Sequence, residues 1–450
     1  MKIKKLNIEY FIYFLIISQS WIISIYSFKS PQILAHSTAL IDKKLYFIGG
    51  FNSETDDRTP FFYLDLNQSF NISSPAYVYL EGPPVKIAWA TACVGGENNA
   101  TIFVFGGLSW YDNSTSYIKD KLINTFDTAS LEWSTPQIEG EPLRRRDLQA
   151  VIDTKGNMYM FGGAYSFYNN TESIRVFNIT FNYPNYSFQT FKDMVIFNTI
   201  TFKYSNGSTI NGPLGMTGYT ATLLPNGIII YIGGKAWSDT ADTTIPIINI
   251  TMYDINEDSW NSTTAKSPND ILDRSYHSAV LTSNGRIICY GGIAELYKAV
   301  SPSLIVLDTT SFEWSSKKEV GTNKPPMLYA HSANLVENYM IIGFGNITDG
   351  DPPTLSTSSN IYILDLRNYT WISYYEASEP SPSPLPSTLP SPTPGTNNIL
   401  GHPKLPLSVG AIIGITIGVA IVLGLLLFFG IRFYRRASLS YTSRIKGIEF

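Results

Sequence analysis

A short apolar strand that ends in glycine recurs through the middle of the chain, and this recurrence constrains the fold of the 450 residues more than any other feature. Five copies end in Gly-Gly and the sixth in Gly-Phe-Gly: 45–50, 102–107, 158–163, 228–234, 287–292 and 340–345. Their first glycines stand at positions 49, 106, 162, 233, 291 and 343, a nearly regular spacing with one longer gap after the third copy. Consecutive apolar residues are typical of strands buried on both faces. One such unit cannot cover both of its own faces, so several units must pack together.

A second signal lies further along each unit, where an Asp or Asn precedes a large aromatic residue by six positions. The pairs are Asp127 with Trp133, Asn198 with Tyr204, Asp254 with Trp260, Asp308 with Trp314 and Asp365 with Trp371. We predict that the Asp or Asn opens a turn by accepting hydrogen bonds from the backbone ahead of it. The aromatic side chain then anchors an outer strand between neighbouring units. The first unit has Asp65 without such an aromatic, so its outer strand is predicted near 77–79.

This pattern resembles the Kelch repeat, and the resemblance covers about three quarters of the chain. It implies an all-β fold: a six-bladed Kelch-type β-propeller of four-stranded antiparallel blades. A seventh, degenerate blade is the alternative. The long gap in the third unit is predicted to contain a protruding hairpin near 167–190.

The two ends of the chain carry signals of export and of membrane attachment. Residues 1–27 combine three lysines with an apolar run, which predicts a signal peptide, with an uncleaved anchor as the alternative. The propeller, 28–376, would be followed by a Pro/Ser/Thr-rich stalk, 377–406. The uncharged run 407–431 predicts one transmembrane helix, and 432–450 a basic cytoplasmic tail. We therefore expect a single-pass type I protein, most simply of the plasma membrane.

Charge and cysteine content narrow the classes of function. Residues 28–431 hold 24 basic residues (32 minus 8) and 34 acidic residues (36 minus 2), so nucleic acid is excluded as a partner. Cys93 and Cys289 are too few for a disulfide framework and are predicted to be free, buried thiols.

Three of the four histidines occupy one repeat position. Counted back from the first glycines of their units, His36, His277 and His331 align to within two positions, on the predicted innermost strand. A structural role, bonding to neighbouring backbone, is the simpler prediction. The sharper alternative is a metal site at the mouth of the channel, since the three units are neighbours in a closed ring. A relative in fold, galactose oxidase, suggests a carbohydrate oxidase, but these histidines lie on equivalent strands and do not converge from unlike loops. We predict no enzyme activity, no catalytic residue, no metal and no cofactor.

Arginines mark the linkers that enter the innermost strands. Arg145 and Arg274 occupy the same position relative to the first glycines of their units, Gly162 and Gly291. In Kelch propellers such linkers help to form the face that grips partners, and guanidinium groups suit carboxylates. Ordinary solvated arginines are the alternative. The predicted ligand-binding residues of this face are Arg144, Arg145, Arg146, Arg274, Tyr276, His277, His331 and His36.

Modification and association motifs complete the sequence. Asn-x-Ser/Thr sequons predict glycosylation at Asn67, Asn71, Asn99, Asn113, Asn169, Asn185, Asn206, Asn261, Asn346 and Asn368, whereas Asn178 and Asn249 are predicted to be unmodified strand residues. Gly410, Gly414 and Gly418 share one face of the predicted helix and could mediate homo-oligomerisation. Ser438 follows two arginines and is a candidate for phosphorylation.

The predicted function is recognition of an extracellular or lumenal protein or glycan by a membrane-embedded propeller. The alternatives are the carbohydrate oxidase and a passive, glycosylated surface or adhesion component.

Overall fold

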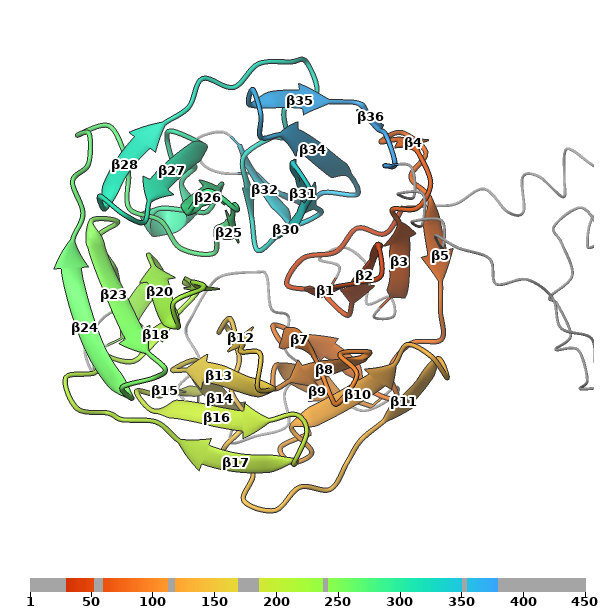
Figure 1. Cartoon of the computed structure of the whole chain (residues 1–450), viewed down its shortest axis with the longest axis vertical. Coiled ribbons are helices and arrows are strands. Elements are labelled where there is room, and N and C mark those ends of the chain that lie inside the picture. The colour runs from red at the N-terminus through yellow and green to blue at the C-terminus, as the bar shows by residue number, and fades with distance from the viewer. Residues whose placement is uncertain are drawn as a thin grey trace, which may run out of the picture. The chain divides into compact units, whose positions relative to one another are not determined.

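The computed structural model describes residues 30–51, 60–111, 118–168, 186–237, 242–349 and 354–378. Within these residues six four-stranded antiparallel sheets, the blades, surround one axis (Figure 1). Each blade is built from one continuous stretch of chain, and its first strand is innermost. The predicted propeller of six four-stranded units is what the described residues form.

The strands of the six blades follow one another in chain order. Blade 1 contains β1 (Ser37–Ile41), β2 (Lys44–Ile48), β3 (Phe61–Asp65) and β5 (Tyr77–Tyr79); blade 2 contains β7 (Thr91–Gly95), β8 (Thr101–Phe105), β10 (Ile123–Asp127) and β11 (Glu132–Ser134). Blade 3 contains β12 (Val151–Ile152), β13 (Asn157–Phe161), β16 (Met194–Asn198) and β17 (Lys203–Asn206); blade 4 contains β19 (Thr220–Leu223), β20 (Ile228–Ile232), β23 (Asn249–Asp254) and β24 (Ser259–Thr264). Blade 5 contains β25 (Ser278–Leu281), β26 (Arg286–Tyr290), β27 (Leu304–Asp308) and β28 (Glu313–Ser316); blade 6 contains β30 (Ser332–Val336), β31 (Tyr339–Gly343), β34 (Ile361–Asp365) and β35 (Thr370–Ile372).

Smaller sheets decorate this ring. They pair β6 (Lys86–Ala88) with β9 (Leu108–Trp110), and β14 (Ala164–Tyr168) with β15 (Tyr186–Thr190). Two three-stranded sheets combine β18 (Met216–Thr217), β21 (Lys235–Trp237) and β22 (Asp242–Thr244), and β29 (Leu328–Tyr329), β32 (Asn346–Asp349) and β33 (Thr354–Thr357). The pair of β14 and β15 confirms the hairpin predicted in the third unit.

The repeat signals act as predicted. In all six units the Asp or Asn carboxyl or amide oxygen accepts hydrogen bonds from backbone N–H groups two or three residues ahead. The tryptophans lie between blades. The ring centroid of Trp260 is 4.6 Å from that of Phe161 in blade 3, and the ring centroid of Trp371 is 5.4 Å from that of Tyr290 in blade 5. In blade 1 the outer strand is β5, at the residues where it was expected. Cys93 and Cys289 are free and buried.

A closed circuit of backbone hydrogen bonds runs around the axis at the entrance to the inner strands. One residue of each blade donates its N–H to the carbonyl oxygen of its counterpart in the preceding blade. The bonds are Trp89 to Ala35 (2.8 Å), Asp147 to Trp89 (3.2 Å), Gly218 to Asp147 (2.9 Å), Tyr276 to Gly218 (2.7 Å), Ala330 to Tyr276 (2.9 Å) and Ala35 to Ala330 (2.9 Å). All six residues have positive φ, between 50° and 62°. Because the last bond joins blade 6 to blade 1, the blades form a ring and not a linear stack.

A second circuit explains the paired glycines. The N–H of the second glycine donates to a linker carbonyl of the next blade: Gly50 to Ile87, Gly107 to Arg145, Gly163 to Met216, Gly234 to Arg274, Gly292 to Leu328 and Gly345 to Ile33, at 2.8 to 3.0 Å. The first glycine lies against the same linker, so a Cβ on Gly106 would be 2.3 Å from the Arg145 oxygen. At Gly106 a side chain is therefore excluded by close approach, and positive φ adds to the preference for glycine, whereas blade 6 has Phe344 (φ +59°) at this position.

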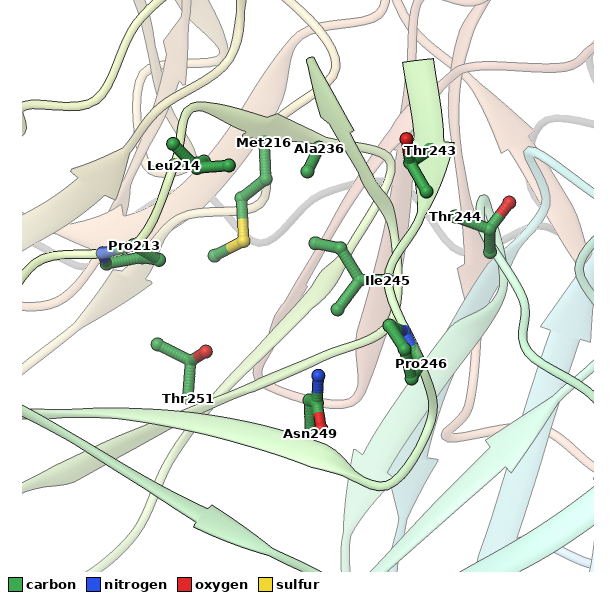
Figure 2. A pocket seen from close by; sticks show the side chains of 10 residues that line it. All are labelled: Pro213, Leu214, Met216, Ala236, Thr243, Thr244, Ile245, Pro246, Asn249 and Thr251. Atoms are coloured by element: carbon green, nitrogen blue, oxygen red, sulfur yellow. The ribbon is translucent and has the colours of Figure 1, made fainter. Parts of the chain in front are cut away.

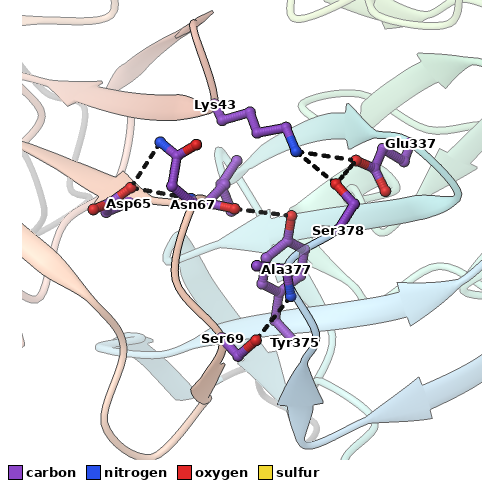
Figure 3. Close-up of polar contacts among 9 residues, drawn as sticks. Lys43, Asp65, Asn67, Ser69, Glu337, Tyr375, Ala377 and Ser378 are labelled. Atoms are coloured by element: carbon purple, nitrogen blue, oxygen red, sulfur yellow. Dashed lines mark hydrogen bonds and ion pairs between the residues drawn. The ribbon is translucent and has the colours of Figure 1, made fainter. Parts of the chain in front are cut away.

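The ring is fastened where its first and last blades meet. β36 (Tyr374–Tyr375), which follows blade 6, pairs with β4 (Phe70–Asn71) of blade 1. The rings of Tyr375 and Phe70 stack at 5.1 Å, and the Tyr375 hydroxyl donates to the Leu66 carbonyl oxygen at 3.4 Å. Ala377 N donates to Ser69 Oγ at 2.9 Å, and Ser378 lies between Lys43 and Glu337 (Figure 3).

We expect Tyr375→Ala to lower the free energy of unfolding by about 3 kcal/mol, because a fully buried aromatic side chain is removed. The measurement is urea denaturation of the full chain. The adjacent Tyr374→Ala is the matched control: its side chain is 53% exposed, and the change should be below about 0.5 kcal/mol. Equal effects of the two substitutions would contradict this account of ring closure.

Two predictions are corrected by the structure. Within the described part of the chain no helix has the length and apolar character needed to cross a bilayer, and the helical element found there is a single 3-10 turn, η1 (Glu295–Tyr297). The predicted fold class, a propeller with one transmembrane helix, is therefore wrong as stated, and the fold supported is an all-β ring. The predicted localisation as a type I membrane protein is wrong on the same finding.

Several predictions lie outside the described residues. These are the signal peptide at 1–27, nearly all of the stalk, the segments 407–431 and 432–450, the glycines Gly410, Gly414 and Gly418, and Ser438.

Candidate ligand-binding face

One face of the ring, the linker face, is built from two sets of segments. They are the linkers that enter the innermost strands and the loops that join the second and third strands of each blade. In every blade the two pair antiparallel directly after the glycines, in the pairs Leu34–Phe51, Ile87–Ser109, Arg146–Ala164, Thr217–Lys235, Ser275–Ile293 and Tyr329–Asn346. The opposite face, the turn face, carries the turns between the first and second strands and between the third and fourth.

Arg145 and Arg274 hold the linkers from inside. Arg145 donates to the Gly162 carbonyl oxygen at 3.2 Å and to both carboxylate oxygens of Asp193, at 2.8 and 3.2 Å. Arg274 is fully buried and donates to the carbonyl oxygens of Gly291 (3.2 Å) and Pro302 (2.9 Å). Burial lowers the pKa of Arg274 to about 10. Each guanidinium group donates a hydrogen bond to the carbonyl oxygen of the first glycine, and this geometry supports a structural role. The binding role predicted for these arginines stays a prediction.

Arg144 and Arg146 differ from each other in surroundings. Arg144 is buried and reaches back into blade 2, where it donates to the carbonyl oxygens of Gly106 (2.7 Å), Asp120 (2.8 Å) and Lys121 (2.9 Å). Arg146 is partly exposed and pairs with the Asp147 carboxylate. Among the predicted arginines, Arg146 is therefore the one with a guanidinium that solvent can reach.

The centre of the linker face is filled by two aromatic side chains. Trp89 and Tyr276 come from opposite members of the six-residue circuit, and their rings meet at 5.6 Å in an edge-to-face contact. Gly218 gives them room, because a Cβ there would lie 3.1 Å from the Tyr276 ring. Tyr276 thus joins Arg146 at the centre of this face.

The three histidines are latches between blades. Nε2 of each ring lies within hydrogen-bonding distance of a hydroxyl in the preceding blade: His36 with Ser332 (2.8 Å), His277 with Thr220 (3.1 Å) and His331 with Ser278 (2.7 Å). Burial lowers the pKa of His36 and of His331 to about 3, and that of His277 well below its ordinary value. The three rings face three different side-chain hydroxyls, whereas the structural prediction was bonding to neighbouring backbone. Among the described residues no group of three His, Cys, Asp or Glu side chains is placed to hold a metal.

The sequons separate by exposure. Those at Asn67, Asn71, Asn99, Asn206, Asn249, Asn261 and Asn368 are exposed. Asn346 is buried and its Nδ2 donates to the Tyr329 hydroxyl at 2.7 Å, so the structure argues against a glycan there. Asn113, Asn169, Asn178 and Asn185 lie outside the described residues. Glycosylation at the exposed positions other than Asn249 stays a prediction, and Asn249, predicted to be an unmodified strand residue, begins β23.

Three exposed leucines on the linker face were not predicted. Leu143, Leu214 and Leu272 belong to three successive linkers, and their exposed fractions are 57%, 66% and 45%. They align with one another relative to the first glycines of their units, and each stands two positions before the place of the buried arginines. Nε of Arg145 and of Arg274 donates to the carbonyl oxygens of Leu143 (3.4 Å) and Leu272 (3.3 Å). The shared repeat position of the three leucines was visible in the sequence, but their exposure to solvent could not be predicted from spacing.

A pocket of about 390 Å³ lies beside the middle leucine (Figure 2). Its walls come from the linker that precedes blade 4, from the hairpin of β21 and β22, and from the start of β23. Figure 2 shows Met216, Ile245 and Asn249 directed toward the same space. None of the ten lining residues carries an ionisable side chain. The arrangement can hold an apolar group and offers no general acid, base or nucleophile.

Comparisons with known proteins agree with this geometry. A family model described as the KLHDC2/KLHL20/DRC7 Kelch-repeats domain matches residues 35–292 and, in an overlapping match, 239–389. A putative protein tag-53 of Caenorhabditis elegans is 23% identical over 240 residues, which are 51% of this chain and 16% of that protein. Kelch domain-containing protein 3 of Bos taurus is 30% identical over 152 residues, which are 32% of this chain and 37% of that protein. The matched part spans less than two fifths of either relative.

Proposed function

The chain belongs to the Kelch-repeat family, whose domains mediate protein–protein interaction, and from this premise we propose that its linker face is a binding surface for another protein. The observation that carries the proposal is the row of leucines at one repeat position in blades 3, 4 and 5. Exposed apolar side chains that gather on one surface mark sites of protein contact. The carbonyl oxygens of Leu143 and Leu272 accept hydrogen bonds from buried arginines, so these two positions are fixed before a partner arrives and little ordering entropy opposes binding there.

The partner in this proposal is an extracellular or lumenal protein. Support comes from the signal-like composition of residues 1–27 and from the sequons that the structure leaves exposed. The proposed role is recognition and not catalysis, because the side chains that gather on this face in the described residues contact one another and the backbone. Arg146 and Tyr276, at the centre, would add polar contacts to the apolar row.

The test compares two faces of the same ring. In one variant Leu143, Leu214 and Leu272 are each replaced by Asp; in the matched control Leu131, Ile200 and Phe202, exposed apolar residues of the turn face, are each replaced by Asp. We expect the full chain to capture a selective set of secreted proteins, the linker-face variant to lose it at least tenfold, and the control to keep it. Thermal unfolding checks that both variants fold. Loss of capture in the control, or its persistence in the linker-face variant, would remove the proposal.

A further inference from the structure

The pocket beside blade 4 lies where blade 3 has an ion pair between the buried Arg145 and the more exposed Asp193. Counted back from the first glycine of its unit, Met216 holds the position that Arg145 holds in blade 3 and Arg274 in blade 5. Two positions before the first glycine, Met160 pairs with Val195 in blade 3 and Tyr231 pairs with Thr251 in blade 4. Counted back two residues from these partners, Asn249 of blade 4 corresponds to Asp193 of blade 3. Met216 and Asn249 therefore replace the Arg145–Asp193 pair, and both line the pocket.

With Met216 in place of an arginine, the carbonyl oxygen of the first glycine in blade 4 has no arginine donor. In blades 3 and 5 the arginine binds the carbonyl oxygen of the first glycine, but no hydrogen bond to the Gly233 oxygen is found among the described residues. Met216 is buried and cannot donate. The space that a guanidinium occupies in blade 3 is bordered here by apolar atoms and neutral amide and hydroxyl groups.

The chemistry of the walls selects the occupant. A charged side chain would lose its hydration without gaining a counter-ion, since no lining residue is ionisable. An apolar side chain would instead gain contact with Met216, Ile245 and Leu214. The volume, about 390 Å³, is in the range of protein pockets that bind small molecules and is ample for one large aliphatic side chain.

The neighbouring hairpin offers backbone contacts to an extended chain. β22 is the terminal strand of the sheet β18–β21–β22, so its outer edge pairs with no other strand in the described part of the chain. Thr243 and Thr244 of β22 also line the pocket. An extended segment added to such an edge places one of its alternate side chains into an adjacent pocket.

We propose that this blade 4 pocket receives a single apolar side chain from an extended, uncharged segment of a partner protein, at the place where blades 3 and 5 have an arginine. The proposal rests on the proposed function of the linker face and specifies the partner's chemistry there. It also explains why the row of exposed leucines is centred on Leu214, which is both the most exposed of the three and a wall of the pocket.

The test uses three peptides that differ at one central position, with leucine, arginine or glutamate in an uncharged Ser/Thr/Gly background. Binding to the full chain is measured by saturation-transfer NMR and by titration. The double variant Met216→Arg/Asn249→Asp fills the pocket with the pair that blade 3 already accommodates. Leu214→Ser removes one wall at an exposed position, so it leaves folding intact. Leu131→Asp, at an exposed position of the turn face and outside the pocket, is the matched control.

We expect the leucine peptide to bind the unmodified chain. Its binding should be at least tenfold weaker to the double variant, several-fold weaker to Leu214→Ser, and unchanged by Leu131→Asp. The inference is overturned if no peptide binds the unmodified chain, if the arginine or glutamate peptide binds as tightly, or if both pocket variants bind leucine normally. Failure here is distinct from failure of the proposed function. If the double variant still captures proteins at its linker face, the proposed function stands and the inference about the pocket is rejected.

Discussion

Gly106→Ala is expected to lower the free energy of unfolding by about 4 kcal/mol, which is much of the stability of an ordinary domain. The added Cβ would lie 2.3 Å from the Arg145 carbonyl oxygen, which belongs to the next blade and already accepts the Gly107 N–H. Backbone on both sides prevents a cheap adjustment, so the seam must open or strain. Positive φ, +69°, adds about 1 kcal/mol for any residue with a side chain. Denaturation with urea, followed by circular dichroism, measures the change.

Gly140→Ala separates the two causes. Gly140 has nearly the same φ, +75°, but a Cβ there would meet nothing within 4 Å. We expect a loss of about 1 kcal/mol, the conformational part alone. If both substitutions cost the same, close packing of the blades at the glycine pair is not what makes glycine necessary.

Acid should destabilise the ring through its histidine latches. In the unfolded chain a histidine has a pKa near 6.5, whereas burial lowers the pKa of His36 and His331 to about 3. The unfolded chain therefore binds protons that the folded chain excludes. Stability is complete above about pH 6.5 and falls as the pH drops toward 3, by about 1.4 kcal/mol per pH unit for each histidine. Between pH 7.5 and 5.0 the His36 and His331 latches should each cost about 2 kcal/mol of folding stability.

His277→Gln tests the origin of this pH dependence. Glutamine can still bond to Thr220 but does not titrate, so the loss of stability between pH 7.5 and 5.0 should be smaller in the variant. Burial raises the pKa of Asp147, which acts in the opposite sense, but this contribution is common to both proteins and cancels in the comparison. An unchanged pH dependence in the variant would mean that His277 is not buried in its neutral form.

The sequence predicted those parts of the fold that repeat. Strands, Asp turns and interblade tryptophans recur from unit to unit, so each position is supported several times. The role of Arg274 was harder to predict, because an arginine in a linker looks solvent-exposed until the unpaired carbonyl oxygen of Gly291 is seen beside it. The backbone circuit was also hidden: five of its six members are not glycine, and nothing in the side chains of Ala35 or Ala330 signals positive φ.

The candidate site was the least predictable part. Spacing alone aligns Met216 with Arg145 and Arg274, so the exchange in blade 4 is visible in the sequence. Its consequence becomes clear only from the structure, where the strand registers align Asn249 with Asp193 and a pocket is lined by Met216 and Asn249. The histidines illustrate the opposite case: their shared repeat position was recognised, but neighbouring backbone was predicted as the partner, and the hydroxyls that they face belong to side chains of other blades.

The chain enters and leaves the ring on opposite faces. Ser30 bonds to the Ser359 carbonyl oxygen on the linker face, whereas Ser378 bonds to Glu337 on the turn face. A pull on the two ends would therefore load the junction of blades 1 and 6 across the thickness of the ring. The pairing of β36 with β4 and the hydrogen bonds of Tyr375 and Ala377 would resist such a load together. Ser378 therefore lies on the face away from the leucine row.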